Sequence, residues 1–190
     1  MSPEEYLSLI AERLRADGAE VTTEYFRGTP AVVGYRSEFR LRWMATKLNL
    51  FTVALAVPLV TPEKLKHFSE EVLDYATSQK GRFRGLQNAV AAIPVQIGSQ
   101  VNPEAILSAE TKLIRRFSAF AWPAVVDLST GRVHSHQGRV AVGGIYASWM
   151  RQQTAVALKD VELKDAHLKD AELKDTERPS KSSPPSAGDR

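Results

Sequence analysis

The chain has 190 residues, of which 43% are hydrophobic and 25% charged, and its formal net charge at pH 7 is +3. This composition fits one globular domain with an appendage and excludes collagen-like, mucin-like and wholly disordered chains. Because the chain has no cysteine, it also excludes disulfides, thiolate metal sites, iron–sulfur clusters and a cysteine nucleophile.

The first part of the chain predicts a helix followed by three strands. Ser2-Pro3-Glu4-Glu5 is a capping box with proline at the first helical position, and an apolar stripe follows as far as Leu14. Strands are expected over residues 21–26, 31–44 and 48–57, and their short connections favour an antiparallel meander. In the second strand, Phe39, Leu41 and Trp43 alternate with charged residues, which predicts one apolar face and one charged face.

The longest apolar run, residues 48–60, is expected to be a buried strand. Its 13 residues are fewer than the roughly 20 that a membrane-spanning helix needs. The N-terminus also lacks the basic start and apolar core of a secretory signal. We therefore expect a cytoplasmic protein without a membrane span.

The second part of the chain predicts alternating helices and strands. Helices are expected from Thr61 to Gly81, from Asn102 to Phe117 and over residues 145–153, and a hairpin over 121–136 turns at Ser129-Thr130. Residues 89–97 form an apolar strand in which Pro94 predicts an edge position or a bulge. The order of elements favours a single α+β domain, with a mixed, mostly antiparallel sheet and helices packed on one face.

The composition changes after this domain, which we place at residues 1–153. Residues 154–177 contain four pentads ending in Leu-Lys-Asp, and residues 178–190 are rich in proline and serine and are expected to be disordered. Acid-before-base pairs four residues apart, such as Asp160 and Lys164, favour a solvated charged helix for the pentads. The pentads also resemble pentapeptide-repeat proteins, which implies a coil of square β-helix with Leu158 and its repeat equivalents inside.

The charged face of the second strand is a candidate surface for nucleic acid. Residues 1–153 contain 18 lysines and arginines against 14 acidic residues, a net charge of +4. Guanidinium groups spaced along a strand can follow a phosphate backbone. The candidate residues are Arg36, Arg40 and Arg42 on the strand, with Arg82 and Arg84 further along the chain. A solvated face or a protein interface explains the same residues, and Glu38 among them would repel phosphate.

Two smaller groups of residues are candidates for other roles. His134 and His136 lie on one face of a predicted strand, and Asp127 lies across its hairpin, so they are weak candidates for a metal site that would lack a full ligand set. Ile145, Tyr146 and Trp149 have helical spacing and form either part of the core or a stripe that binds a partner. No cofactor is expected.

The opening order of elements resembles the core of the PD-(D/E)xK nuclease fold. The nearest match to the family's Glu-x-Lys is Glu38-Phe39-Arg40, which has arginine in place of lysine and no suitable aspartate before it. These departures affect the residues that carry the chemistry, so the resemblance implies fold order more than activity.

No motif in the chain identifies a reaction. We therefore expect a non-enzymatic interaction or scaffold protein that associates with itself or with a protein partner. Nucleic-acid binding through the arginine face is the alternative, and a divergent metal-dependent nuclease is its enzymatic version.

Overall fold

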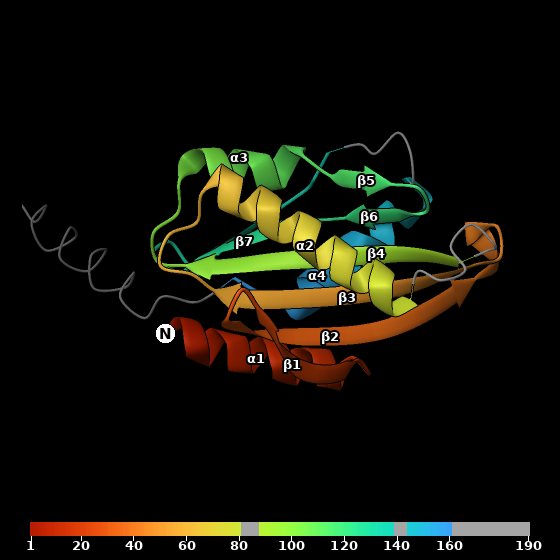
Figure 1. The fold of residues 1–190 in the computed structure, drawn as a ribbon, viewed down its shortest axis with the longest axis horizontal. Helices are drawn as coiled ribbons and strands as arrows, with labels where there is room; N and C mark the ends of the chain where they lie inside the picture. The colour runs from red at the N-terminus through yellow and green to blue at the C-terminus, as the bar shows by residue number, and fades with distance from the viewer. Residues whose placement is uncertain (81–87, 139–143, 161–190) are drawn as a thin grey trace, which may run out of the picture.

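A computed structural model describes residues 1–80, 88–138 and 144–160 (Figure 1). The α-helices are α1 (Pro3–Ala16), α2 (Pro62–Lys80), α3 (Pro103–Thr111) and α4 (Ala147–Ala157), and two short 3-10 helices are η1 (Leu41–Trp43) and η2 (Gly144–Tyr146). The strands are β1 (Glu20–Phe26), β2 (Thr29–Arg40), β3 (Thr46–Ala56), β4 (Asn88–Gly98), β5 (Ile114–Arg116), β6 (Ala119–Ala121), β7 (Ala124–Asp127) and β8 (Arg132–Ser135).

The strands form one mixed sheet, which confirms the predicted α+β domain. Strands β1, β2 and β3 are the expected antiparallel meander, and β4 pairs parallel with β3 after the crossover through α2. The other edge of β4 pairs parallel with β6 and then with β7, and β5 and β8 complete two antiparallel hairpins. Antiparallel pairings therefore outnumber parallel ones by four to three.

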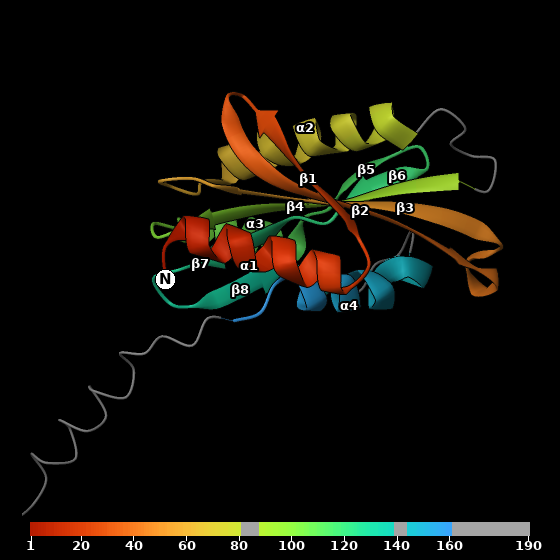
Figure 2. The same ribbon diagram turned by 90° about the horizontal axis from the view of Figure 1, so that it is seen from below.

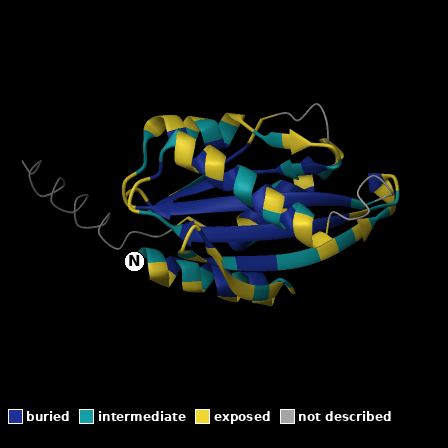
Figure 3. Cartoon of the chain, in the orientation of Figure 1, coloured by how far each residue is buried: buried dark blue, intermediate teal, exposed yellow. Residues whose placement is uncertain are grey.

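Helices cover both faces of this sheet, so the prediction that they pack on one face is wrong. Figure 2 shows α2 on one side and α1 and α4 on the other. On β3, Leu48 and Leu50 pack in the core with α1 and α4, whereas Phe51 and Val53 pack in the core with α2. Central strands joined by a parallel crossover are buried on both faces and need cover on each. Figure 3 shows β3 and β4 almost entirely buried.

The second strand ends earlier than the alternation predicts. Strand β2 stops at Arg40, and the chain continues as the 3-10 turn η1. Met44 and Ala45 then take positive φ angles of 57° and 54°, which return the chain into β3. Trp43 is therefore buried while Leu41 is exposed, although the pattern places both on one face.

Pro94 lies in the central strand and not at an edge. Strand β4 pairs with β6 at Ala92 and with β7 from Val95, so Pro94 falls where one partner ends and the other begins. The backbone groups of the even-numbered residues of β4 face β6 and β7. For example, the Ala92 carbonyl accepts a hydrogen bond from the Trp122 amide at 2.7 Å. The missing N–H of proline therefore falls between the two ladders, where neither partner strand pairs with β4.

Two of the later helices have different bounds from those predicted. Helix α3 ends at Thr111, and the apolar residues expected on its last turn instead belong to the β5–β6 hairpin, where Phe117 is exposed at the turn. Helix α4 runs past Gln153 to Ala157. The predicted hairpin turn at Ser129-Thr130 is confirmed, with Gly131 in the left-handed region at φ 72°.

The chain continues to pack on the body of the domain after Gln153. Ala157 and Leu158 are buried in the core with α1 and β3. The Tyr6 hydroxyl donates to the Lys159 carbonyl at 2.7 Å, and the Val133 amide donates to Asp160 Oδ1 at 2.9 Å. The rest of the predicted charged helix, residues 161–177, and the proline-rich end lie outside the described residues. Among the residues described, no helix is both long and apolar enough to cross a membrane.

Candidate functional site

The predicted arginine face is held by ion pairs within the protein. The Arg36 guanidinium donates to the carboxylate and, at 3.2 Å, to the carbonyl of Asp17 at the end of α1. It also donates to Gln153 Oε1 at 3.1 Å, which links β2 to α4. Its side chain is largely buried. Arg36 therefore connects β2 to two helices and offers few donors to a ligand.

The other predicted arginines have different surroundings. Arg40 Nε donates to Glu38 Oε1 at 2.9 Å, and its guanidinium lies over the ring of Trp43 at 5.0 Å. Arg42 lies on η1 and not on the strand; it is exposed and has no ion pair among the described residues. Arg82 and Arg84 lie outside the described residues. Of the three predicted arginines that the structure describes, Arg42 is thus the exposed one.

Replacing Arg36 by alanine is expected to destabilise the fold. This effect should exceed any effect of the substitution on ligand binding. Hydrogen bonds to charged groups contribute roughly 1.5–3 kcal/mol, so we expect the free energy of unfolding to fall by about 1–3 kcal/mol. Urea denaturation of the full chain measures this change. Arg42→Ala is the matched control and should stay within about 0.5 kcal/mol of the parent. Equal losses in both variants would contradict this role for Arg36.

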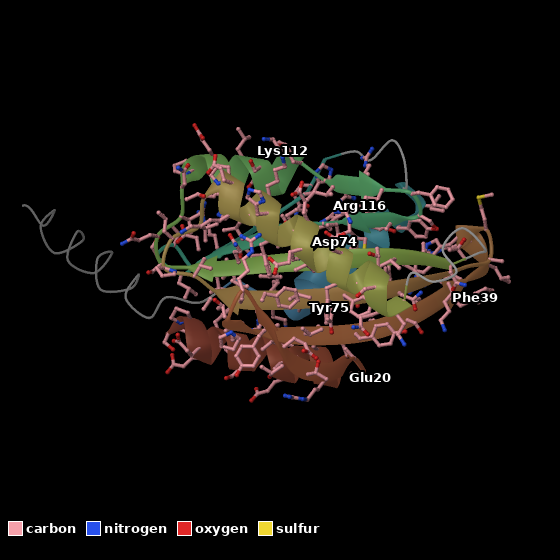
Figure 4. The ribbon with its side chains drawn as sticks, viewed as in Figure 1. Glu20, Phe39, Asp74, Tyr75, Lys112 and Arg116 are labelled. Atoms are coloured by element: carbon pink, nitrogen blue, oxygen red, sulfur yellow. The ribbon has the colours of Figure 1, made fainter. Side chains whose placement is uncertain are left out.

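An exposed apolar surface lies where β2 turns into β3. Phe39, Leu41 and Met44 are 58%, 80% and 82% exposed, and we call these three residues the apolar tip. Figure 4 labels Phe39 at this end of the molecule, away from α1 and α3. The neighbouring cations Arg42 and Lys47 are exposed and form no ion pair within the described part of the chain. The surface is therefore apolar with a basic border.

Trp43 fixes the apolar tip to the core. Its side chain is fully buried and packs edge-on against Trp149 and Tyr146, with ring centroids 5.1 and 5.3 Å apart. Its Nε1 donates to the Ile145 carbonyl at 3.0 Å. Of the predicted partner-binding stripe, Trp149 is thus part of the core, Tyr146 is half-buried, and Ile145 is exposed beside the apolar tip.

The predicted metal residues do not come together. Asp127 accepts hydrogen bonds from Ser129 and Thr130. Burial raises the pKa of its carboxyl, but these hydrogen bonds lower the pKa by more, so its pKa lies below the usual value. His134 Nδ1 lies 2.9 Å from Glu110 Oε1. In the described ranges no three His, Cys, Asp or Glu residues are grouped as metal ligands would be. Glu38, the candidate nuclease carboxylate, pairs with Arg36 and Arg40.

A pocket of about 620 Å³ lies beside the break between β6 and β7. It is lined by residues of α2, the end of α3, β5 and the segments next to β7 and β8, among them Leu65, Lys66, Lys112, Arg115, Pro123 and His136. We call it the fork pocket, because the two hairpins pair one after the other along the same edge of β4. Figure 4 labels Lys112 at the end of α3.

The patterns in the sequence did not predict the apolar tip or the fork pocket, for different reasons. The run Trp43-Met44-Ala45 breaks the alternation of β2, and this signal could have shown that the strand had ended. The fork pocket has no local signal, because its lining comes from four separate segments. A comparison with models of known protein families finds no match to this chain, and a comparison with curated proteins finds none either.

Proposed function

We propose that this protein is a non-enzymatic interaction module that binds a protein partner through the apolar tip. The observation that carries the proposal is the exposure of Leu41 and Met44 on a turn whose backbone is held by the buried Trp43. A surface held in one conformation loses little entropy on binding, which favours affinity. The expected cytoplasmic location would give this surface access to intracellular partners.

The charges at the apolar tip indicate the chemistry of the partner. Arg42 and Lys47 border the apolar residues, so a complementary surface would have an apolar groove edged by carboxylates. A symmetric contact between two tips would bring these cations together, which disfavours self-association at this surface. Nucleic acid would suit the cations, but Arg36 and Arg40 already pair with Asp17 and Glu38.

Photo-crosslinking tests this proposal directly. A benzophenone amino acid replaces Leu41 or Met44 in the full chain, which is expressed in its native cell. We expect one discrete protein adduct from each position and none from Leu107, an apolar residue on α3 that is 59% exposed. The purified partner should then bind the chain, and Leu41→Asp with Met44→Asp should weaken that binding by about 30-fold or more, as for other apolar hot spots.

Three outcomes would contradict the proposal. They are adducts that form equally from Leu107, adducts that contain only a second copy of this chain, and adducts that contain nucleic acid. The last outcome would favour the alternative function through Arg42 and its neighbours.

A further inference from the structure

Strand β1 is an open edge of the sheet. It has seven residues, stands first in the strand order and pairs with β2 alone among the described strands. Its register with β2 is continuous from Glu20 to Phe26, so no bulge interrupts it, and it contains neither proline nor lysine. Proteins usually protect edge strands by such residues, by bulges or by shortness. The other described edge strands, β5 and β8, have only three and four residues.

The hairpin turn determines which backbone groups of β1 point away from the sheet. Residues 27–28 form a two-residue turn with positive φ angles of 50° and 80°, which is the geometry of a type I′ turn. The flanking Phe26 and Thr29 therefore exchange hydrogen bonds, and hydrogen-bonded pairs alternate with open pairs from there on. Pro30, which has no N–H, accordingly falls in an open pair. Three residues of β1 direct their N–H and C=O groups outward: Val21, Thr23 and Tyr25.

The β1–β2 hairpin is fixed to the body of the domain. Phe26 is buried and packs edge-on against Phe68 and Tyr75 of α2, with ring centroids 5.8 and 5.4 Å apart. Arg27 Nε lies 3.0 Å from Glu71 Oε2, also on α2. Figure 2 shows the hairpin beside α2. The outward groups are therefore held in place before any partner arrives, which reduces the entropy lost on binding.

The two faces of β1 offer different side chains to an added strand. Glu20 and Glu24 are exposed on one face and form no ion pair within the described part of the chain. Burial raises the pKa of the Tyr75 hydroxyl and the Glu24 carboxylate raises it further, so this face is the one toward α2. Tyr25, on the opposite face, is 73% exposed. Figure 4 labels Glu20 and Tyr75. The edge thus combines free backbone groups with two carboxylates four residues apart.

A second copy of β1 fits this edge poorly. Antiparallel strands would pair through their outward groups, so Thr23 would lie opposite Thr23, Val21 or Tyr25 of the other copy. The first register makes the two Glu24 side chains diagonal neighbours. The other two registers place Glu24 directly opposite a glutamate of the other copy. Like charges that face each other across a strand pair are destabilising, which favours a partner with cations.

We propose that β1 binds an extended basic segment of a protein partner, which adds a strand to the sheet. The segment exchanges hydrogen bonds with the outward groups of β1. It places two lysines or arginines, four residues apart, opposite Glu20 and Glu24, and a β-branched or aromatic residue beside Tyr25. Because β1 pairs with β2 only as far as Tyr35, this edge is separate from the apolar tip. The proposal does not depend on the proposed function.

Titration of the full chain with a synthetic peptide tests the proposal. The probe has the sequence Thr-Lys-Val-Thr-Val-Lys-Val, followed by fluorescence anisotropy and by the amide signals of β1. We expect saturable binding with a dissociation constant of about 1 mM or lower, together with shifts of the amide signals of Val21, Thr23 and Tyr25. A peptide with glutamate in place of both lysines, and one of the same composition with adjacent lysines, should each bind about tenfold more weakly or worse.

Two variants and a control locate the contact. Thr23→Pro removes an outward N–H without removing a bond to β2, so the domain should still fold while peptide binding is lost. Glu20→Lys with Glu24→Lys changes two exposed side chains and should reverse the preference, so that the glutamate peptide binds better than the lysine peptide. Leu41→Asp with Met44→Asp at the apolar tip should leave peptide binding unchanged.

Four results would overturn the proposal. They are absence of saturable binding, equal binding of the three peptides, full binding by a folded Thr23→Pro variant, and dimerisation of the chain that protects the β1 amides from hydrogen exchange without peptide. If Thr23→Pro does not fold, the charge reversal decides, and an unchanged preference for the lysine peptide would then be the contrary result.

Discussion

Replacing Leu158 by alanine is expected to lower the free energy of unfolding by about 2–5 kcal/mol. Leu158 follows α4 and is buried in the core with α1 and β3, so the shorter side chain leaves a cavity. Such a loss is a large part of the roughly 5–15 kcal/mol that stabilises a typical domain. Urea denaturation of the full chain measures it, and Lys159→Ala is the control because that side chain is exposed.

The same packing distinguishes two truncated chains. A chain that ends at Gln153 lacks Leu158 and the Lys159 carbonyl, which accepts a hydrogen bond from the buried Tyr6 hydroxyl. The shorter chain therefore loses both this packing and this hydrogen bond. We expect the chain that ends at Asp160 to unfold at a clearly higher urea concentration. Equal midpoints for the two chains would show that residues 154–160 do not stabilise the domain.

The second large effect is expected for Trp43→Ala, which should cost about 3–5 kcal/mol. Trp43 is fully buried between Trp149 and Tyr146, and its Nε1 donates to the Ile145 carbonyl. Its removal also frees the turn in which Met44 and Ala45 hold positive φ angles. Thermal and urea unfolding of the full chain measure the loss.

Two controls separate packing from exposure at this position. Trp43→Phe keeps an aromatic ring but loses the hydrogen bond, so we expect a smaller cost of about 1–3 kcal/mol. Leu41→Ala changes a side chain that is 80% exposed and should stay within about 0.5 kcal/mol. A Trp43→Ala variant as stable as Leu41→Ala would show that Trp43 does not anchor the apolar tip.

The elements that local signals define were predicted well. The capping box at Ser2 and Glu5 is present, and both of its hydrogen bonds form. Gly131 takes the left-handed conformation that the hairpin turn requires. These features depend on residues only a few positions apart, so the sequence contains the whole interaction.

The elements that depend on distant partners were not predicted. Helical spacing extends the third helix to Phe117, but pairing of β5 with β6 overrides it, which no local pattern records. The position of Pro94 depends on a break in the neighbouring strand, nearly 30 residues further along the chain. The fork pocket was missed for the same reason, since His136 reaches it only through the complete sheet.

The tandem arrangement of the two hairpins has a consequence for how the domain opens. Each hairpin pairs with its own stretch of β4, and no strand pairing in the described sheet joins the two hairpins. One hairpin can therefore separate from β4 while the hydrogen bonds of the other remain intact. The amides of β6 and β7 would exchange with solvent through separate opening events. We therefore expect a stable central sheet with two separately opening units along one edge.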